Sequence, residues 1–143
     1  MHVQHILALK GRNVITIDVS ATLEAAAKTL ATHRIGAVLI TGSDATPVAG
    51  ILSERDIVRT VADKGAAALG LSVSHAMTAK VSTCSPTDTV DAVMEMMSTG
   101  RFRHLPVVED GQIAGMISIG DVVKHRISQI EAEKDALREF IAG

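Results

Sequence analysis

The sequence predicts a mixed α/β fold built from two copies of one unit, each reading strand, helix, strand, strand, helix. The segment Val14–Ile40 matches Val81–Val107 at a constant offset of 67, with identical residues at six positions. The segment Val48–Arg59 matches Ile113–Lys124 at an offset of 65, with five of twelve residues identical. Because a unit of about 50 residues buries too little apolar surface to be stable alone, we expect the two to pack sheet to sheet about a pseudo-twofold axis.

Each copy is expected to begin with a short β-rich run, Val14–Ile17 in the first and Val81–Cys84 in the second. A helix follows, because apolar residues recur three and four positions apart along Leu23–Leu30 and Val90–Met97. The expected N-caps of these helices are Ser20 and Thr87.

Two strands follow the helix in each copy. We expect Ile35–Thr41 to pair with Val48–Leu52 across Thr41–Pro47. Phe102–Val108 is expected to pair with Gln112–Ile117 across an Asp-Gly turn, a strong hairpin signal. The returning strands contain Gly50 and Gly115, and glycine in a strand is typical of close backbone approach.

The rest of the chain frames the two copies. A short helix, Val3–Leu9, precedes the first copy, Lys64–Ser72 connects the two, and a long helix runs from about Asp121 to Ile141. The expected divisions are residues 1–66 (first repeat with the N-terminal helix), 67–126 (second repeat) and 127–143 (C-terminal helix extension).

Composition excludes several kinds of function. The 143 residues are 47% hydrophobic but only 1% aromatic, which disfavours a nucleic-acid stacking platform. With 14 Lys and Arg against 16 Asp and Glu, there is no basic excess for duplex binding. A single cysteine, Cys84, excludes an internal disulfide and a cysteine-based zinc site, and the six histidines lack ligand spacing. No apolar run is long enough to span a membrane, so we expect a cytoplasmic protein with no membrane, nucleic-acid or metal partner.

The most informative motif is Gly-h-h-Ser-x-x-Asp, where h is apolar, and it occurs at Gly50–Asp56 and at Gly115–Asp121. A serine that begins a helix places its hydroxyl beside unpaired backbone N–H groups, which suit a phosphate. An aspartate one turn later accepts hydrogen bonds from a vicinal diol such as a ribose. Phosphate and diol together indicate a nucleotide. The alternative is that both residues only cap their helices, which a single copy of the motif would favour.

The chain resembles tandem CBS domains, named for cystathionine β-synthase, and most of all the small stand-alone bacterial members. The two motif copies, the repeat length, Ser53–Arg59 and the strand in Gly100–Val108 carry the resemblance, which spans about Val3 to Arg126. It implies that two clefts between the repeats bind adenosyl compounds: AMP, ADP, ATP, NAD(H) or S-adenosylmethionine. No obligatory cofactor is expected.

The motif and the resemblance together propose site residues. The expected ribose ligands are Asp56 and Asp121, and the expected phosphate ligands are Ser53, Ser118, Arg55, Arg103 and His104. Adenine is expected against the backbone of Ile15, Ile35 and Ala37 in the cleft of Asp121, and of Ser82, Phe102 and His104 in that of Asp56. The alternatives are a solvent-facing Arg103 and a buried, neutral His104. Gly36 and Ala37 stand where Arg103 and His104 would be in the first repeat, so the two clefts are not equivalent.

These features predict an adenosyl-nucleotide-binding regulatory or sensor module that signals to a separate, unknown partner. An enzyme is not expected, because neither motif supplies a base for its serine. A homodimer is expected, through the apolar faces of the paired helices or through the C-terminal stripe of Ile127, Ile130, Leu137 and Ile141. The alternative function is a structural protein-interaction module with vestigial clefts.

Overall fold

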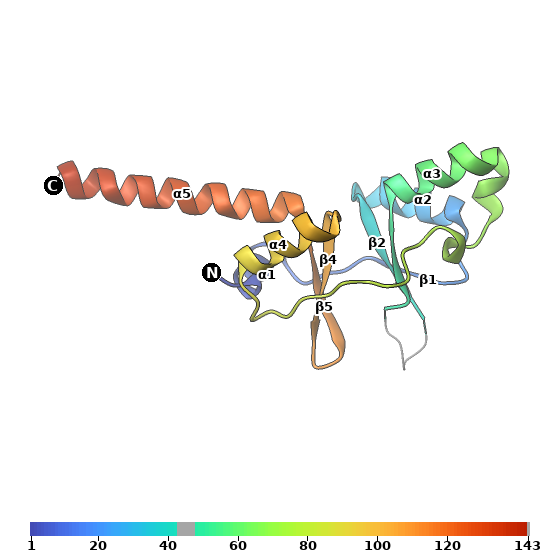
Figure 1. Ribbon diagram of the computed structural model, residues 1–143, viewed down its shortest axis with the longest axis horizontal. Helices are drawn as coiled ribbons and strands as arrows, with labels where there is room; N and C mark the ends of the chain where they lie inside the picture. Colours follow the sequence, from blue (N-terminus) through green and yellow to red (C-terminus); the bar gives the residue numbers. More distant parts are fainter. Residues whose placement is uncertain (43–47, 143) are drawn as a thin grey trace.

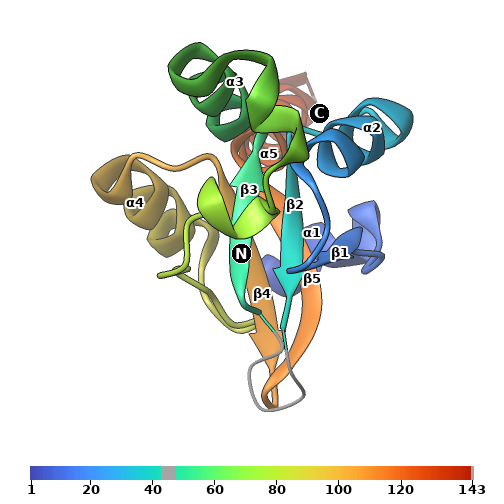
Figure 2. The ribbon, with the colours of Figure 1, turned by 90° about the vertical axis from the view of Figure 1, so that its right-hand side faces the viewer.

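The computed structural model describes residues 1–42 and 48–142, which form two small sheets that lie side by side, with helices around them (Figures 1 and 2). The first repeat comprises β1 (Thr16–Asp18), α2 (Leu23–His33), β2 (Ala37–Thr41), β3 (Gly50–Ser53) and α3 (Glu54–Lys64). The second comprises α4 (Val90–Gly100), β4 (His104–Glu109), β5 (Gln112–Ser118) and α5 (Ile119–Ala142). The flanking elements are α1 (Val3–Lys10) and two 3₁₀ helices, η1 (Gly65–Gly70) and η2 (Val73–His75).

The predicted strand pairing is formed in both repeats. In the first sheet, β1 is parallel to β2, and β2 is antiparallel to β3. In the second, β4 is antiparallel to β5. The Asp-Gly turn between them has positive φ at both residues, 52° at Asp110 and 75° at Gly111, as a tight turn of the primed type requires. The turn predicted across Thr41–Pro47 falls at residues 43–47, outside the described residues.

The strand predicted at Val81–Cys84 is wrong: within the described residues, only Cys84 bridges to Val107 of β4. The reason is Pro106. In the first repeat the amide of Leu39 donates to the carbonyl of Ile15 at 3.4 Å. Pro106 occupies the position of Leu39 at the offset of 67 and has no N–H to donate to Ser82, so the pairing stops after one residue.

The predicted N-caps of α2 and α4 are wrong by two residues. The caps are Thr22 and Thr89, whose hydroxyls accept from the amides three residues on at 3.2 and 3.1 Å. Ser20 instead donates its backbone N–H and its hydroxyl to Asp18. Threonine is a slightly weaker cap than serine, but the turn before the helix already occupies the serine.

The segment that precedes each repeat packs into the core of the other repeat. Val3, Ile6 and Leu7 of α1 are buried in the core of the second repeat, together with residues of α4, β4, β5 and α5. The segment around η2, which precedes the second repeat, packs its buried Val73 into the core of the first. Matched hydrogen bonds hold the two exchanges, from Val3 N to Asp88 O and from Val73 N to Ala21 O, both 2.9 Å. Each repeat is therefore completed by the segment that precedes the other, as a pseudo-twofold relationship requires.

Glycines in the returning strands make room for the exchanged segments. A Cβ on Gly115 would lie 2.6 Å from Cδ2 of Leu7, and a Cβ on Gly50 would lie 2.6 Å from the sulfur of Met77. Leu7 and Met77 occupy equivalent positions, 70 residues apart. The close backbone approach expected at these glycines is confirmed at Gly50, where the carbonyl of Thr78 would lie 2.9 Å from a Cβ, whereas at Gly115 the close neighbour is the side chain of Leu7.

Helix α5 extends well beyond the two sheets (Figure 1). Its first turns pack on β5, α1 and α4, and its last residues stand clear of the body. No helix within residues 1–42 and 48–142 combines the length and apolar character needed to cross a membrane.

Candidate functional site

Both copies of the Ser-x-x-Asp motif form a reciprocal cap at the start of a helix. At α3 the Ser53 amide donates to Asp56 Oδ2 at 2.9 Å, and the Asp56 amide donates to Ser53 Oγ at 3.2 Å. At α5 the corresponding distances between Ser118 and Asp121 are 2.9 and 3.1 Å. The capping role is therefore real in both repeats, and any ligand role is additional to it.

The Asp56 cleft lies between the two repeats and has a volume of about 510 Å³, within the usual range of small-molecule sites. The first repeat supplies the residues around the cap of α3, and the second repeat supplies the opposite wall. Of the residues predicted for this cleft, those that line it are Ser53, Arg55, Asp56, Ser82, Phe102, Arg103 and His104. Ala37, which was predicted for the other cleft, lines this one as well. The structure thus brings Ser53 and Asp56 together with the strand that follows α4.

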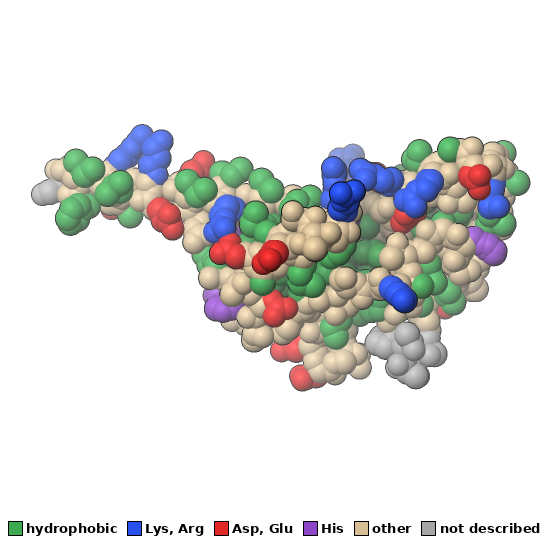
Figure 3. Space-filling view, viewed as in Figure 1, with side chains coloured by type: hydrophobic (Ala, Val, Ile, Leu, Met, Phe, Trp, Pro, Cys, Tyr) green, Lys and Arg blue, Asp and Glu red, His purple; other side chains and the backbone are tan. Residues whose placement is uncertain are grey.

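Cationic side chains outnumber carboxylates in the Asp56 cleft. Five cations line it, namely Arg55, Arg59, Lys80, Arg101 and Arg103, against the two carboxylates Glu54 and Asp56. Figure 3 shows Lys and Arg side chains gathered beside the hollow between the two halves of the molecule. In a chain of net charge −2, this local excess favours an anionic ligand.

Asp56 is 8% exposed, and its carboxylate is held at both oxygens. Besides the bond from Ser53 to Oδ2, the guanidinium of Arg59 donates to Oδ1 at 2.9 Å. Arg59 is itself mostly exposed and lies one turn further along α3. The carboxylate is oriented by its neighbours, and Arg59 is the side chain that a competing ligand could move.

A second cleft, the Ser118 cleft, is smaller, with a volume of about 260 Å³. Its lining includes the predicted residues Ile15, Ile35, Ala37, His104 and Ser118. Asp121 does not line it, although it caps the same helix. The ammonium of Lys10 donates to Asp121 Oδ2 at 2.6 Å and to the carbonyl of Met116 at 2.8 Å. Lys10 therefore stands between this cleft and the aspartate predicted to serve it.

The Lys10 contact changes the acidity of Asp121. Partial burial acts to raise the pKa of the carboxyl, but the hydrogen bond from Lys10 and the bonds from Ser118 outweigh it. The net result is a pKa below the ordinary value, so Asp121 is an anion paired with a cation from the other end of the chain.

His104 lines both clefts at once. Burial removes water from its ring and, with Lys10 and Arg103 nearby, lowers its pKa, while Asp121 and Glu54 act in the opposite direction. Its ring also lies against Gly36, whose Cβ, if present, would be 3.4 Å from Nε2. His104 is thus a mostly neutral imidazole in the wall between the two sites.

The cleft residues not predicted from the sequence include Lys10, Arg59, Thr78, Lys80 and Arg101. A signal for two of them existed. Val3 and His5 recur as Val73 and His75 at an interval of 70, and the same interval relates Lys10 to Lys80. Extending that match would have paired the two lysines across the two sites.

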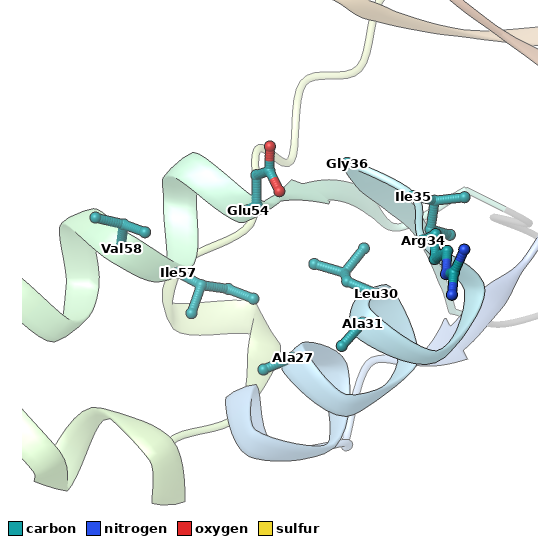
Figure 4. A pocket seen from close by; sticks show the side chains of 9 residues that line it. All are labelled: Ala27, Leu30, Ala31, Arg34, Ile35, Gly36, Glu54, Ile57 and Val58. Carbon is teal, nitrogen blue, oxygen red and sulfur yellow. The ribbon is translucent and has the colours of Figure 1, made fainter.

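A third hollow, the α2–α3 groove, has a different character (Figure 4). Its walls are Ala27, Leu30 and Ala31 of α2 and Ile57 and Val58 of α3, with Glu54 and Arg34 at its edge. It contains neither a capping serine nor the buried aspartate. The groove is therefore an apolar surface and not a candidate for the phosphate and diol chemistry of the motif.

The possible metal ligands and the single cysteine are candidates for reactive sites. Across residues 1–42 and 48–142, no three His, Cys, Asp or Glu side chains converge as a metal site. Cys84 is buried, and burial together with the nearby Asp88 raises the pKa of its thiol to about 12. It is a core residue rather than a reactive one.

Two exchanged α/β repeats, with clefts lined by both and a Ser–Asp cap beside each, define a tandem-repeat module. The family model "CBS domain" matches residues 8–63 and again 73–128. The chain belongs to the CBS domain family, as the sequence motifs indicated. The two matches also support two repeats, while the finer divisions at residues 66 and 126 stay predictions.

Two CBS-domain proteins illustrate the similarity of this chain to known proteins. The CBS domain-containing protein CBSX3, mitochondrial, of Arabidopsis thaliana is 34% identical over 125 residues, which cover 85% of this chain and 61% of that protein. The chain thus spans less than two thirds of that relative. The crystal structure of the CBS-domain protein ATU1752 from Agrobacterium tumefaciens is 51% identical, with a TM-score of 0.84 over 87% of this chain and 92% of that one.

Two similar structures hold adenosyl ligands. The CBS domain protein PAE2072 from Pyrobaculum aerophilum is complexed with AMP; it is 28% identical, with a TM-score of 0.74 over 85% of this chain and 89% of that one. The CBS domain pair of protein MJ0100, in complex with 5′-methylthioadenosine and S-adenosyl-L-methionine, is 25% identical, with a TM-score of 0.79 over 90% and 98%. Related modules therefore bind ligands that share adenosine but differ in charge.

Proposed function

We propose that this chain is a regulatory module that binds a phosphate-bearing adenosyl nucleotide, of the AMP, ADP, ATP or NAD(H) class, in the Asp56 cleft. The observation that carries the proposal is the composition of that cleft. A capped helix N-terminus and a buried aspartate from one repeat face a cationic wall from the other. The AMP and S-adenosylmethionine complexes of related modules support the adenosine part.

In this proposal, different residues bind the ribose and the phosphate of the ligand. The Asp56 carboxylate accepts the ribose hydroxyls, and Arg59, which now donates to Oδ1, turns toward solvent or toward the ligand. Ser53 Oγ already accepts from the Asp56 amide and has its hydroxyl proton left to donate to a phosphate oxygen. Arg55, Arg103 and Lys80 neutralise the phosphate charge.

Adenine is recognised by the backbone around Ser82, Phe102 and His104. Pro106 has no amide N–H to donate to the carbonyl of Ser82, which supports this role for Ser82. The equivalent carbonyl, of Ile15, accepts from Leu39. The Asp56 cleft thus offers the exocyclic amine of adenine an acceptor that the other cleft has partly used.

The Ser118 cleft takes a different ligand or none. It has about half the volume of the Asp56 cleft, and the ammonium of Lys10 donates a hydrogen bond to the carboxylate of Asp121. A ribose at Asp121 must first displace that ammonium. We therefore assign the principal site to Asp56 and a weaker adenosine site to Ser118, Asp121, Ile15, Ile35 and Ala37.

Binding acts as a signal because the ligand contacts both repeats. A nucleotide that holds the first repeat by Asp56 and the second by Arg103 favours one relative packing of the two, and a separate partner protein reads it. The module acts without catalysis, as a homodimer and in the cytoplasm; these parts of the proposal come from the sequence.

A thermal-shift panel tests the proposal. The full chain is heated with AMP, ADP, ATP, NAD⁺, NADH or S-adenosylmethionine, and with inorganic phosphate as the control for charge alone. A ligand present at about 100 times its dissociation constant stabilises the fold by roughly 2.7 kcal/mol. A shift with at least one phosphate-bearing nucleotide and none with phosphate is expected. If no adenosyl compound shifts the unfolding temperature, the interaction-module alternative replaces the proposal.

A further inference from the structure

Helix α5 carries an apolar stripe that the body does not cover. From Ile130 to Ala142 every residue is exposed, and Ile127, Ile130 and Leu137 are 52%, 56% and 59% exposed. Figure 3 shows hydrophobic side chains along this projecting helix. A free helical end of about 20 Å is marginal in water by itself. A partner surface that covers the stripe would stabilise this end as a helix.

The stripe has the period of a coiled coil. Its positions alternate in steps of four and three, which assigns successive residues to the d and a sites of a heptad. The d sites hold Val123, Ile130 and Leu137, and the a sites hold Ile127, Lys134 and Ile141. We infer that α5 pairs with α5 of a second copy of this chain, parallel and in register, as a two-stranded coiled coil. β-Branched residues at a with leucine at d favour two strands, as Ile141 and Leu137 provide, and one lysine at a fixes the register.

The charges beside the stripe match a parallel pair. In that arrangement a g residue faces the e residue five positions later in the other helix. Glu133 then faces Arg138 of the second copy, and the symmetric contact repeats it. Lys134 lies beside Glu133 of the second copy, which offsets the two facing lysines. Arg126 would face Glu131 in the same way, although it also bonds to Asp91 within the chain.

The same charges oppose an antiparallel pair. The antiparallel register that keeps the apolar layers in contact places Ile127 opposite Leu137 and Ile130 opposite Lys134. It then sets Glu131 against Glu131 and Glu133 against Glu133 of the other copy. Like charges at these flanking sites disfavour a pairing. Charge complementarity therefore selects the second copy as occupant and the parallel direction.

The pairing deepens the homodimer part of the proposed function, and cysteine cross-linking tests it independently of nucleotide binding. Leu137→Cys places a thiol at a d site, where parallel, in-register helices bring the two copies together. Glu139→Cys, two residues on and on the outer face, is the matched control. The native Cys84 does not interfere, because it is buried and its thiol pKa is about 12.

Under mild oxidation we expect Leu137→Cys to form a disulfide-linked dimer and Glu139→Cys to stay uncross-linked. Equal cross-linking of the two variants, or none in either, would overturn the pairing of α5. Light scattering on the same samples then shows whether a homodimer exists through another contact such as the α2–α3 groove. The thermal-shift panel shows separately whether nucleotide binding stands.

Charge reversal tests whether the two α5 helices run parallel. Glu133→Lys faces Arg138 of the second copy in two symmetric contacts and should weaken dimerisation on the order of tenfold by sedimentation equilibrium. Adding Arg138→Glu restores the opposite-charge pairs and should restore the dimer. Failure of the double variant to recover, with unchanged helix content by circular dichroism, would contradict the parallel arrangement.

Discussion

The ammonium of Lys10 lies 2.6 Å from Oδ2 of Asp121, across 111 residues of sequence, and fastens the N-terminal helix to the start of α5. Its counterpart Lys80 lines the Asp56 cleft, but Asp56 is held instead by Arg59, three residues along its own helix. The two motifs are alike in sequence and capping, and they differ in which cation guards the carboxylate. Under the proposed function, this difference favours nucleotide binding in the Asp56 cleft, because a ribose at Asp121 must first displace Lys10.

The ion pair between Lys10 and Asp121 predicts that Lys10→Met strengthens adenosine binding in the Ser118 cleft. The measurement is calorimetry in an Asp56→Ala background, so that the remaining heat reports that cleft. Adenosine is the probe, because it has the ribose diol but no phosphate for Lys10 to bind. Removing a partly exposed ion pair worth roughly 0.2–1 kcal/mol should tighten binding up to about fivefold. Unchanged or weaker binding would show that Lys10 does not compete with the ribose for Asp121.

His104 predicts a loss of stability on acidification. Its folded pKa lies below the ordinary value near 6.5, so the unfolded chain takes up the proton more readily. The stability of the fold with neutral His104 is fully present above about pH 6.5. It is lost as the pH falls through the pKa of His104 in the folded chain. Urea denaturation at about pH 7.5 and about pH 5.5 should show a smaller pH effect in His104→Gln than in the wild type. The exposed His75→Gln is the control, and an equal pH effect in both variants would refute the role of His104.

The two strand glycines predict unequal costs of an added methyl group. In Gly50→Ala the new Cβ meets the backbone carbonyl of Thr78 at 2.9 Å as well as Met77, so the chain itself must move. In Gly115→Ala it meets only the side chain of Leu7. We expect a loss of about 1–3 kcal/mol for Gly50→Ala and less for Gly115→Ala, measured by urea denaturation. The reverse order would contradict this packing.

The exchange of α1 predicts that its inner face stabilises the second repeat. Leu7→Ala should lower the free energy of unfolding by about 2–5 kcal/mol, because Leu7 is 1% exposed within that core. Leu9→Ala, two residues away and 82% exposed, should change it by less than about 0.5 kcal/mol. Similar effects of the two substitutions would mean that α1 does not dock as described.

Features that depend on neighbours in the sequence were predictable. The duplication, the helical stripes and the Asp-Gly turn at Asp110 and Gly111 all follow from local patterns, and the structure contains them. The Ser53–Asp56 cap follows from helical spacing in the same way. Arg59 could also have been found, since a cation three residues after an aspartate lies on the same face of a helix.

Features that depend on distant partners were not predictable. The strand at Val81–Cys84 fails because of Pro106, a residue of the strand it would have paired with. The exchange of α1 depends on which core is left open, and the Lys10–Asp121 contact follows from that exchange. The caps at Thr22 and Thr89 are a separate case, because local turns engage the hydroxyls of Ser20 and Thr87 with Asp18 and Ser85, two residues earlier in the chain.

Calorimetric titration of AMP into the wild type, Asp56→Ala and Asp63→Ala tests the central claim most directly. Asp63 lies on the exposed side of the same helix and controls for the loss of a carboxylate from α3. The account predicts that Asp56→Ala loses the principal AMP site while Asp63→Ala binds like the wild type. Equal binding by the wild type and Asp56→Ala would contradict it, because the nucleotide would then lie outside the cleft that joins the two repeats.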